Sequence, residues 1–99
     1  MNVLMVRAKI KDENVADARA ATEKVIQALE RARPADVRYT VSVLGDGVTL
    51  IALLELKPDG GHPLATFPAY TELVENLKEW YAEPPTVERM TVVGSYQLF

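Results

Sequence analysis

The pair of residues best suited to chemistry is Asn76 and Trp80. They lie four residues apart in a segment with a helical pattern, so their side chains are expected on one side of a helix. An amide beside an indole at the edge of a pocket offers two N–H donors, which could hold a substrate oxygen as negative charge develops on it. We predict Asn76 and Trp80 as catalytic residues. The alternative, that Trp80 belongs to the core and Asn76 to the surface, stays open.

Tyrosines could add a hydroxyl group to the same pocket, although a tyrosine more often packs with its tip in water. Tyr70 is the best placed, because it belongs to the apolar side of the expected second helix together with Phe67 and Leu77. Tyr39 falls in an expected strand. We predict these four residues as substrate-binding residues.

Arg7 and His62 are the remaining candidates for substrate binding. Arg7 falls in a strand expected at the centre of the sheet, where its charge needs a partner. It would either bind an anionic substrate or pair with Glu55 or Glu88. His62 lies in the loop sequence GGHP and would act as a general base if that loop folded over the pocket. Otherwise it is an exposed loop histidine.

Composition argues against several functional classes. The chain has 99 residues, a single-domain length covering 1–99, with no cysteine and one histidine. Disulfides, thiol catalysis and cysteine-bound metals are therefore excluded, and little is left for a histidine metal site. The net charge of −3 argues against nucleic acid and against an anionic membrane surface as partners. No run reaches the ~20 apolar residues of a membrane helix, and the N-terminal segment has the pattern of a strand and not of a signal peptide, so we expect a cytoplasmic protein.

Hydrophobic periodicity predicts four strands and two helices. An N-cap from Asp12 or Asn14 is expected before the first helix, and a tight turn at Gly45-Asp46-Gly47 between the second and third strands. Arg89, on the last strand, is expected to be solvated. The expected elements are strands at Val3–Ile10, Val37–Leu44, Val48–Leu56 and Val87–Tyr96, and helices at Val15–Ala32 and Leu64–Ala82, the second with an irregular start around Phe67-Pro68.

This β-α-β-β-α-β order predicts an α+β, ferredoxin-like subunit with the first and third strands at the centre of the sheet. Apolar residues fall on both faces of the expected sheet, so the pattern does not say which face meets the helices. Two helices cover only one face, and the simplest cover for the other is a second copy of the chain, with the C-terminal tail lying across the partner. We therefore expect a homodimer. The residues behind this expectation are Val3, Met5, Ile51, Leu53, Met90 and Val92.

The element order, the length, and the segments FPAYTELVENLKEWYAEPP and VERMTVVGSYQLF together resemble the antibiotic biosynthesis monooxygenase-like family of the dimeric α/β-barrel superfamily, over nearly the whole chain. The resemblance implies a pocket between sheet and helices, and oxidation of phenolic or anthrone-like substrates by O₂ without metal, flavin or other cofactor. Some members use an Asn and a Trp at the spacing of Asn76 and Trp80. The second helix lacks the histidine that many relatives carry, which argues against haem and against their acid–base scheme.

Three functions follow as hypotheses. The first is a cofactor-independent monooxygenase that acts on an aromatic or quinone-type small molecule. The second is a non-catalytic barrel that binds a hydrophobic or aromatic ligand, which the shortage of acid–base groups favours. The third is a purely structural oligomer. The sequence leaves open whether the protein is an enzyme, which substrate it takes, and whether Arg7 is salt-bridged.

Overall fold

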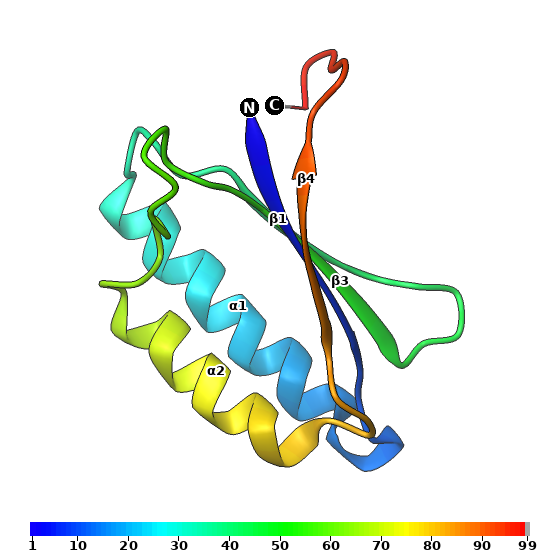
Figure 1. The fold of residues 1–99 in the computed structure, drawn as a ribbon. Helices are drawn as coiled ribbons and strands as arrows, with labels where there is room; N and C mark the ends of the chain where they lie inside the picture. The colour runs from blue at the N-terminus through cyan, green and yellow to red at the C-terminus, as the bar shows by residue number, and fades with distance from the viewer. Residues whose placement is uncertain (99) are drawn as a thin grey trace.

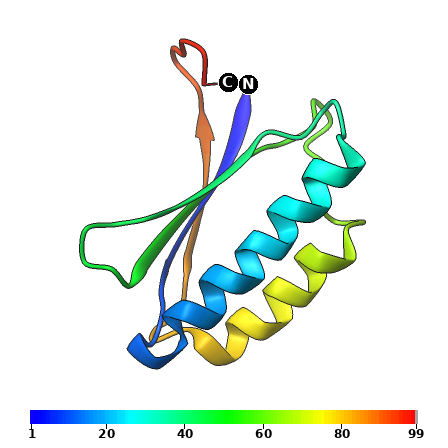
Figure 2. The ribbon, with the colours of Figure 1, turned by 180° about the vertical axis from the view of Figure 1, so that it is seen from behind.

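A computed structural model describes residues 1–98 as two layers, a twisted sheet and a pair of helices that lie on one side of it (Figure 1). The view from behind shows the same arrangement, with the other side of the sheet free of helices (Figure 2). These residues form β1 (Asn2–Lys9), η1 (Asp12–Asn14), α1 (Val15–Ala32), β2 (Tyr39–Val43), β3 (Thr49–Glu55), α2 (Pro68–Trp80) and β4 (Thr86–Thr91). The predicted ferredoxin-like α+β order is confirmed.

The sheet is antiparallel throughout, in the order β2-β3-β1-β4. The prediction that the first and third strands are central is therefore confirmed. The pairing register places Leu4 between Leu54 of β3 and Arg89 of β4. Residues opposite one another share a face of the sheet, so this register fixes which side chains point toward the helices.

The face that meets the helices carries Ala8 and Leu50, which are buried in one cluster with Ala18 of α1. By alternation, Leu4 and Val6 share this face. The opposite face holds Met5, Ile51 and Leu53, which are half-buried, and Met90, which is 36% exposed. The largest fully buried side chains are Ile10, Leu64, Val3 and Val25, each contributing roughly 1.5–3 kcal/mol of burial.

Helix α1 has the predicted bounds, and it ends where Arg33 turns to a left-handed conformation (φ 47°). The Arg33 N–H still donates to the Leu29 carbonyl at 2.8 Å. The predicted N-cap is wrong, because no side chain caps either η1 or α1. Asn14 instead donates from Nδ2 to Asp17 Oδ2 at 3.0 Å, an interaction between two side chains.

Helix α2 and strand β4 are shorter than predicted. The helix begins at Pro68, because Phe67 precedes a proline and is held extended (φ −87°, ψ 116°). It ends at Trp80, and Tyr81 turns away to bridge Ile10. β4 ends at Thr91, opposite Asn2, the first residue of β1. Beyond it, Val93 is 100% exposed.

Asp46 organises the turn between β2 and β3. Its Oδ1 atom accepts bonds from the Val48 and Thr49 amides at 3.0 and 2.9 Å, and its Oδ2 atom accepts one from the Thr49 hydroxyl at 2.6 Å. These bonds, the Thr49 hydroxyl first, lower the pKa of Asp46 to about 2. Gly47 takes the positive φ of 76° that the turn requires.

Candidate functional site

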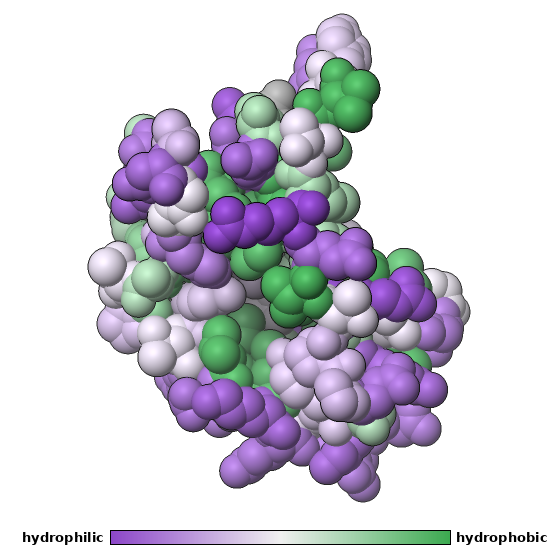
Figure 3. Space-filling model, viewed as in Figure 1, coloured by the Kyte–Doolittle hydropathy of each residue, from purple (hydrophilic) through white to green (hydrophobic). Residues whose placement is uncertain are grey.

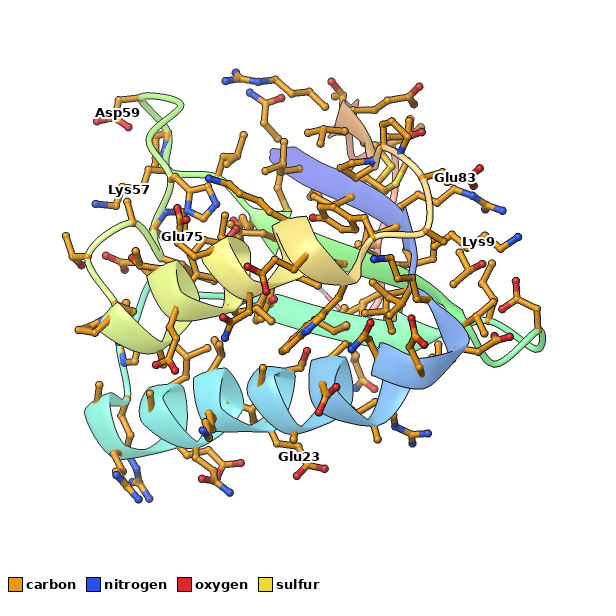
Figure 4. All side chains as sticks on the ribbon, turned by 90° about the horizontal axis from the view of Figure 1, so that it is seen from below. Lys9, Glu23, Lys57, Asp59, Glu75 and Glu83 are labelled. Carbon is orange, nitrogen blue, oxygen red and sulfur yellow. The ribbon has the colours of Figure 1, made fainter. Side chains whose placement is uncertain are left out.

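Helix α2 presents two different faces, and the predicted site residues are divided between them. Asn76 and Trp80 lie on the side that meets α1, the neighbouring helix in the layer. Tyr70 lies on the side that meets the sheet, where its ring packs on Tyr39 of β2. Figure 4 shows the two helices side by side, with Lys57 and Asp59 at one end of the molecule and Lys9 and Glu83 at the other.

Asn76 and Trp80 line an interhelical groove of about 210 Å³, whose other wall is formed by Ala20, Ala21 and Lys24 of α1. Trp80 also packs against the buried cluster that contains Ala8. The indole is therefore partly a core residue, in line with the alternative prediction that Trp80 belongs to the core. The sequence predicts these two side chains on one side of a helix, and the structure confirms it; that side borders α1, and only Trp80 also reaches the core cluster on the sheet.

Near the start of α2, His62 and Tyr70 make direct contact. The Nε2 atom of His62 lies 3.2 Å from the hydroxyl oxygen of Tyr70, and the two rings are 5.0 Å apart between centroids. The Leu64 amide donates to His62 Nδ1 at 3.2 Å, so Nδ1 must carry a lone pair. In the neutral ring the proton is then on Nε2 and is donated to Tyr70. The hydroxyl hydrogen of Tyr70 is left available to another acceptor.

Burial governs the electrostatics of this group. Desolvation lowers the pKa of His62 below its usual 6.5. Protonating Nδ1 would also break its bond from the Leu64 amide, which agrees with a neutral ring. Desolvation raises the pKa of Tyr70 and of Tyr39, whose rings meet edge to face at 6.4 Å. Both hydroxyls are therefore neutral at pH 7 and are able to donate a hydrogen bond.

A cleft opens between the helices and β4. The space-filling view shows a hollow here, with hydrophobic side chains around it (Figure 3). Val87 of β4 is on the helix-facing side, paired with Val6, yet it is 55% exposed. Val74 of α2 is 36% exposed. We call this space the helix–sheet cleft.

Arg89 also lies in this region; the sequence predicted it to be solvated and not part of a site, and it is exposed. It is paired with Leu4 and shares the helix-facing side of β4 with Val87. Its Nη1 atom lies 3.9 Å from the position that a Cβ on Gly60 would occupy. The long side chain thus reaches from β4 to the loop that carries His62. The alternation of side chains along β4 could have indicated which sheet face Arg89 occupies, but not that its side chain extends to the loop of His62.

Arg7 lies outside the cleft, on the sheet face away from the helices. Paired with Ile51 and Thr86, it is exposed and lines a polar hollow that also contains Lys9, Asp46 and Glu83. Arg7 forms no salt bridge with any residue in 1–98. The alternative that Arg7 pairs with Glu55 or Glu88 is therefore wrong. Glu55 lies 3.5 Å from Nε of Arg38, the residue before β2.

The remaining predicted residues lie along α2. Leu77 packs against the cluster of Ala8 and Leu50, and Phe67 is the half-buried residue before the helix, whose carbonyl accepts the Tyr70 amide at 3.1 Å. The structure therefore brings together Tyr70, Tyr39 and His62, with Leu77 on the sheet-facing side of the same helix. It separates them from Asn76 and from Arg7.

Within residues 1–98, no three His, Asp or Glu side chains gather as metal ligands would. In the same part of the chain, neither helix is long and apolar enough to cross a membrane.

Solved structures with this architecture carry one recurrent description. A Nitrosomonas europaea protein assigned to the antibiotic biosynthesis monooxygenases matches with a TM-score of 0.77 and 16% identity, over 95% of this chain and 100% of that one. A second antibiotic biosynthesis monooxygenase structure gives 0.70 and 18%, with the same coverage. Rv0793 from Mycobacterium tuberculosis gives 0.63 and 17%, over 95% and 96%.

No protein-family model matches the chain, and no curated protein matches it in sequence. At identities below one fifth, the structural matches establish the shared fold and leave the chemistry to be tested. The predicted resemblance is confirmed at that level: the chain has the ferredoxin-like, monooxygenase-like fold of the antibiotic biosynthesis monooxygenase structures.

Proposed function

We propose that the protein binds a flat, electron-rich aromatic molecule in the helix–sheet cleft and oxidises it with O₂, without a metal or flavin. The observation that carries this proposal is the His62–Tyr70 contact, with His62 Nδ1 occupied by the Leu64 amide. It leaves the Tyr70 hydroxyl free to donate to a substrate oxygen. The monooxygenase-like fold supports the same reaction class.

The role of Tyr70 is to stabilise negative charge on the substrate. A phenol or enol that loses its proton to water places charge on one oxygen, and a donor already oriented toward that oxygen stabilises the anion. His62 strengthens the donor, because donation from Nε2 to the Tyr70 oxygen polarises the O–H bond. The half-buried aromatic rings around it lower the local dielectric constant and hold a flat ligand.

The reaction needs no external reductant. For an anthrone, the carbanion form transfers electrons to O₂, the ring carbon forms a C–O bond, and the O–O bond then breaks. The CH₂ group becomes C=O, one oxygen atom is retained in the product, and the other leaves as water with the two hydrogens. The four electrons that O₂ accepts come from the substrate, so atoms and electrons balance.

The proposal includes a homodimer. Met5, Ile51 and Leu53 lie on the sheet face that the helices leave open, and Met90 on the same face is 36% exposed. Beyond β4, Tyr96 and Leu98 are 86% and 64% exposed. A second copy of the same face would cover these apolar side chains. This pairing would leave the helix–sheet cleft of each subunit on the outside of the shared sheet layer.

Oxygen uptake by the purified protein tests the function, with anthrones and dihydroxynaphthoquinones as substrates and no added cofactor. Tyr70→Phe should lower the uptake rate by roughly 100-fold, as removal of one oxyanion donor does. Tyr96→Phe is the matched control, because it removes a tyrosine hydroxyl from the tail beyond β4 and not from the His62–Tyr70 contact. If uptake falls with Asn76→Ala or Trp80→Phe and not with Tyr70→Phe, the reaction takes place in the interhelical groove and the proposed site is wrong.

A second function is favoured by a specific observation, namely that both ring nitrogens of His62 are engaged. The one histidine of the chain is then not free to take a proton, which suits a binding protein as well as an enzyme. In that case the same aromatic molecules would bind, with an affinity that depends on Tyr70, and no oxygen would be consumed.

A further inference from the structure

We propose that Arg89 selects for an acidic substituent, so that the preferred ligands of the cleft are aromatic acids with a phenolic oxygen near the carboxylate. This inference rests on the proposed function, since it takes the helix–sheet cleft as the binding site. It adds the chemical class of the ligand, and it assigns a specificity role to a residue outside the Tyr70–His62 pair.

The position of Arg89 follows from the sheet register. Pairing with Leu4 places it on the helix-facing side of β4, two residues from Val87 on the same side. Its Nη1 atom approaches Gly60, which holds a positive φ of 87° in the loop between β3 and α2. The same loop continues to His62, whose Nε2 atom contacts the Tyr70 hydroxyl. A cation and a hydroxyl donor therefore meet at the same loop.

The guanidinium of Arg89 has no protein partner among residues 1–98, in either a salt bridge or a hydrogen bond. Glu88 is its neighbour in sequence but is paired with Met5, so its side chain is on the opposite face of the sheet. Asp59, the acid of the nearby loop, accepts the Gly61 amide at 2.8 Å and lines a different hollow with Arg38. The donors of Arg89 are thus free for a ligand.

The chemistry of the guanidinium points to a carboxylate. Its planar set of N–H donors matches the two oxygens of a carboxylate, and such charge-assisted pairs are about twice as strong as neutral hydrogen bonds. An aromatic acid would place its ring in the cleft, its carboxylate on Arg89 and its phenolic oxygen on Tyr70.

Calorimetric titration with two matched probes tests the inference: 1-hydroxy-2-naphthoic acid, and 1-naphthol, which lacks only the carboxylate. The wild-type protein should bind the acid at least about tenfold more tightly, the ratio expected for one charge-assisted bond. Arg89→Gln should reduce the ratio to about one while leaving 1-naphthol affinity unchanged, and Arg89→Lys should retain part of the preference. Arg31→Gln, which removes the same charge from an exposed position of α1, should leave the ratio unchanged.

Each other outcome has a distinct meaning. If the preference for the acid survives in Arg89→Gln, or if that variant loses both probes equally, Arg89 does not select the acid and this inference is wrong, while the cleft remains the binding site. If the wild-type protein binds neither probe, or if Tyr70→Phe leaves both affinities unchanged, the cleft itself is the wrong site. The proposed function and this inference then fail together.

Discussion

The Nε2 atom of His62 lies 3.2 Å from the Tyr70 hydroxyl oxygen, which ties the loop after β3 to the first turn of α2. A second bond, from the Leu64 amide to Nδ1, holds the imidazole from the other side. The ring is therefore fixed in one orientation by a backbone group and presents its one proton to one acceptor. The loop that carries His62 is anchored at the residue nearest the proposed site.

The state of His62 makes stability depend on pH. Because burial lowers the pKa of His62, the unfolded chain binds its proton more readily than the folded one. The stabilisation is complete above the unfolded value of 6.5 and is lost as the pH falls through the folded value. Urea unfolding between pH 7 and 5 should show a larger loss for the wild-type protein than for His62→Gln. Equal losses in the two proteins would show that His62 titrates normally.

Leu64 anchors both the core and the imidazole, since it is 0% exposed and its amide binds His62. Leu64→Ala should lower the free energy of unfolding by about 2–4 kcal/mol, through lost burial and the cavity left behind. Leu44→Ala, at a position that is 37% exposed, should change it by less than about 1 kcal/mol. Chemical denaturation measures both. Similar values for the two variants would mean that the space around Leu64 collapses without cost.

The Asp46 turn gives a second pH effect, at lower pH. Its pKa of about 2, against the usual 3.8, provides stability above pH 4 that is lost as the pH falls toward 2. Thr49→Val removes the hydroxyl that contributes most to this shift and keeps the shape of the buried side chain. An NMR titration of Asp46 should then give a higher pKa than in the wild-type protein. An unchanged value would show that the two backbone amides alone hold the carboxylate.

The proposed homodimer predicts the effect of a charge on the open sheet face. Leu53→Asp should convert a dimer into a monomer, because it places an unpaired carboxylate in the apolar interface. Sedimentation velocity measures the change. Leu44→Asp, in the turn after β2, adds the same charge outside that face and should leave the dimer intact. A wild-type monomer, or a Leu53→Asp dimer, would contradict the proposed interface.

The fold could be predicted from local patterns because each element has its own period. The bounds of α1 follow from its apolar stripe and from Arg33-Pro34, and the central strands follow from connection handedness. Element ends that depend on a distant partner could not be predicted. β4 ends at Thr91, opposite the first residue of β1, Asn2. The sequence of β4 alone does not indicate where its partner strand begins.

The candidate site shows the same division. Four-residue spacing correctly places Asn76 and Trp80 on one side of α2, but which neighbour that side meets depends on how the helix is rotated over the sheet. Arg7 was expected either to bind an anionic substrate or to pair with Glu55 or Glu88. In the structure, Glu55 forms a salt bridge with Arg38 instead. Whether Asn76, Trp80 and Arg7 act in binding or catalysis stays a prediction, which Asn76→Ala and Trp80→Phe test for the first two.

The topology also has a consequence for the order of folding. β1 and β4 pair residues from opposite ends of the chain, Asn2 with Thr91, and the Val92 amide donates to the Met1 carbonyl at 3.0 Å. Pairing across the longest loop of the sheet carries the largest closure entropy, so it is expected after the β2–β3 hairpin has formed. β4 supplies Val87 and Arg89 to the cleft. The recognition surface would therefore be completed in the last stage of folding, and a chain arrested before that stage would have a core but no binding site.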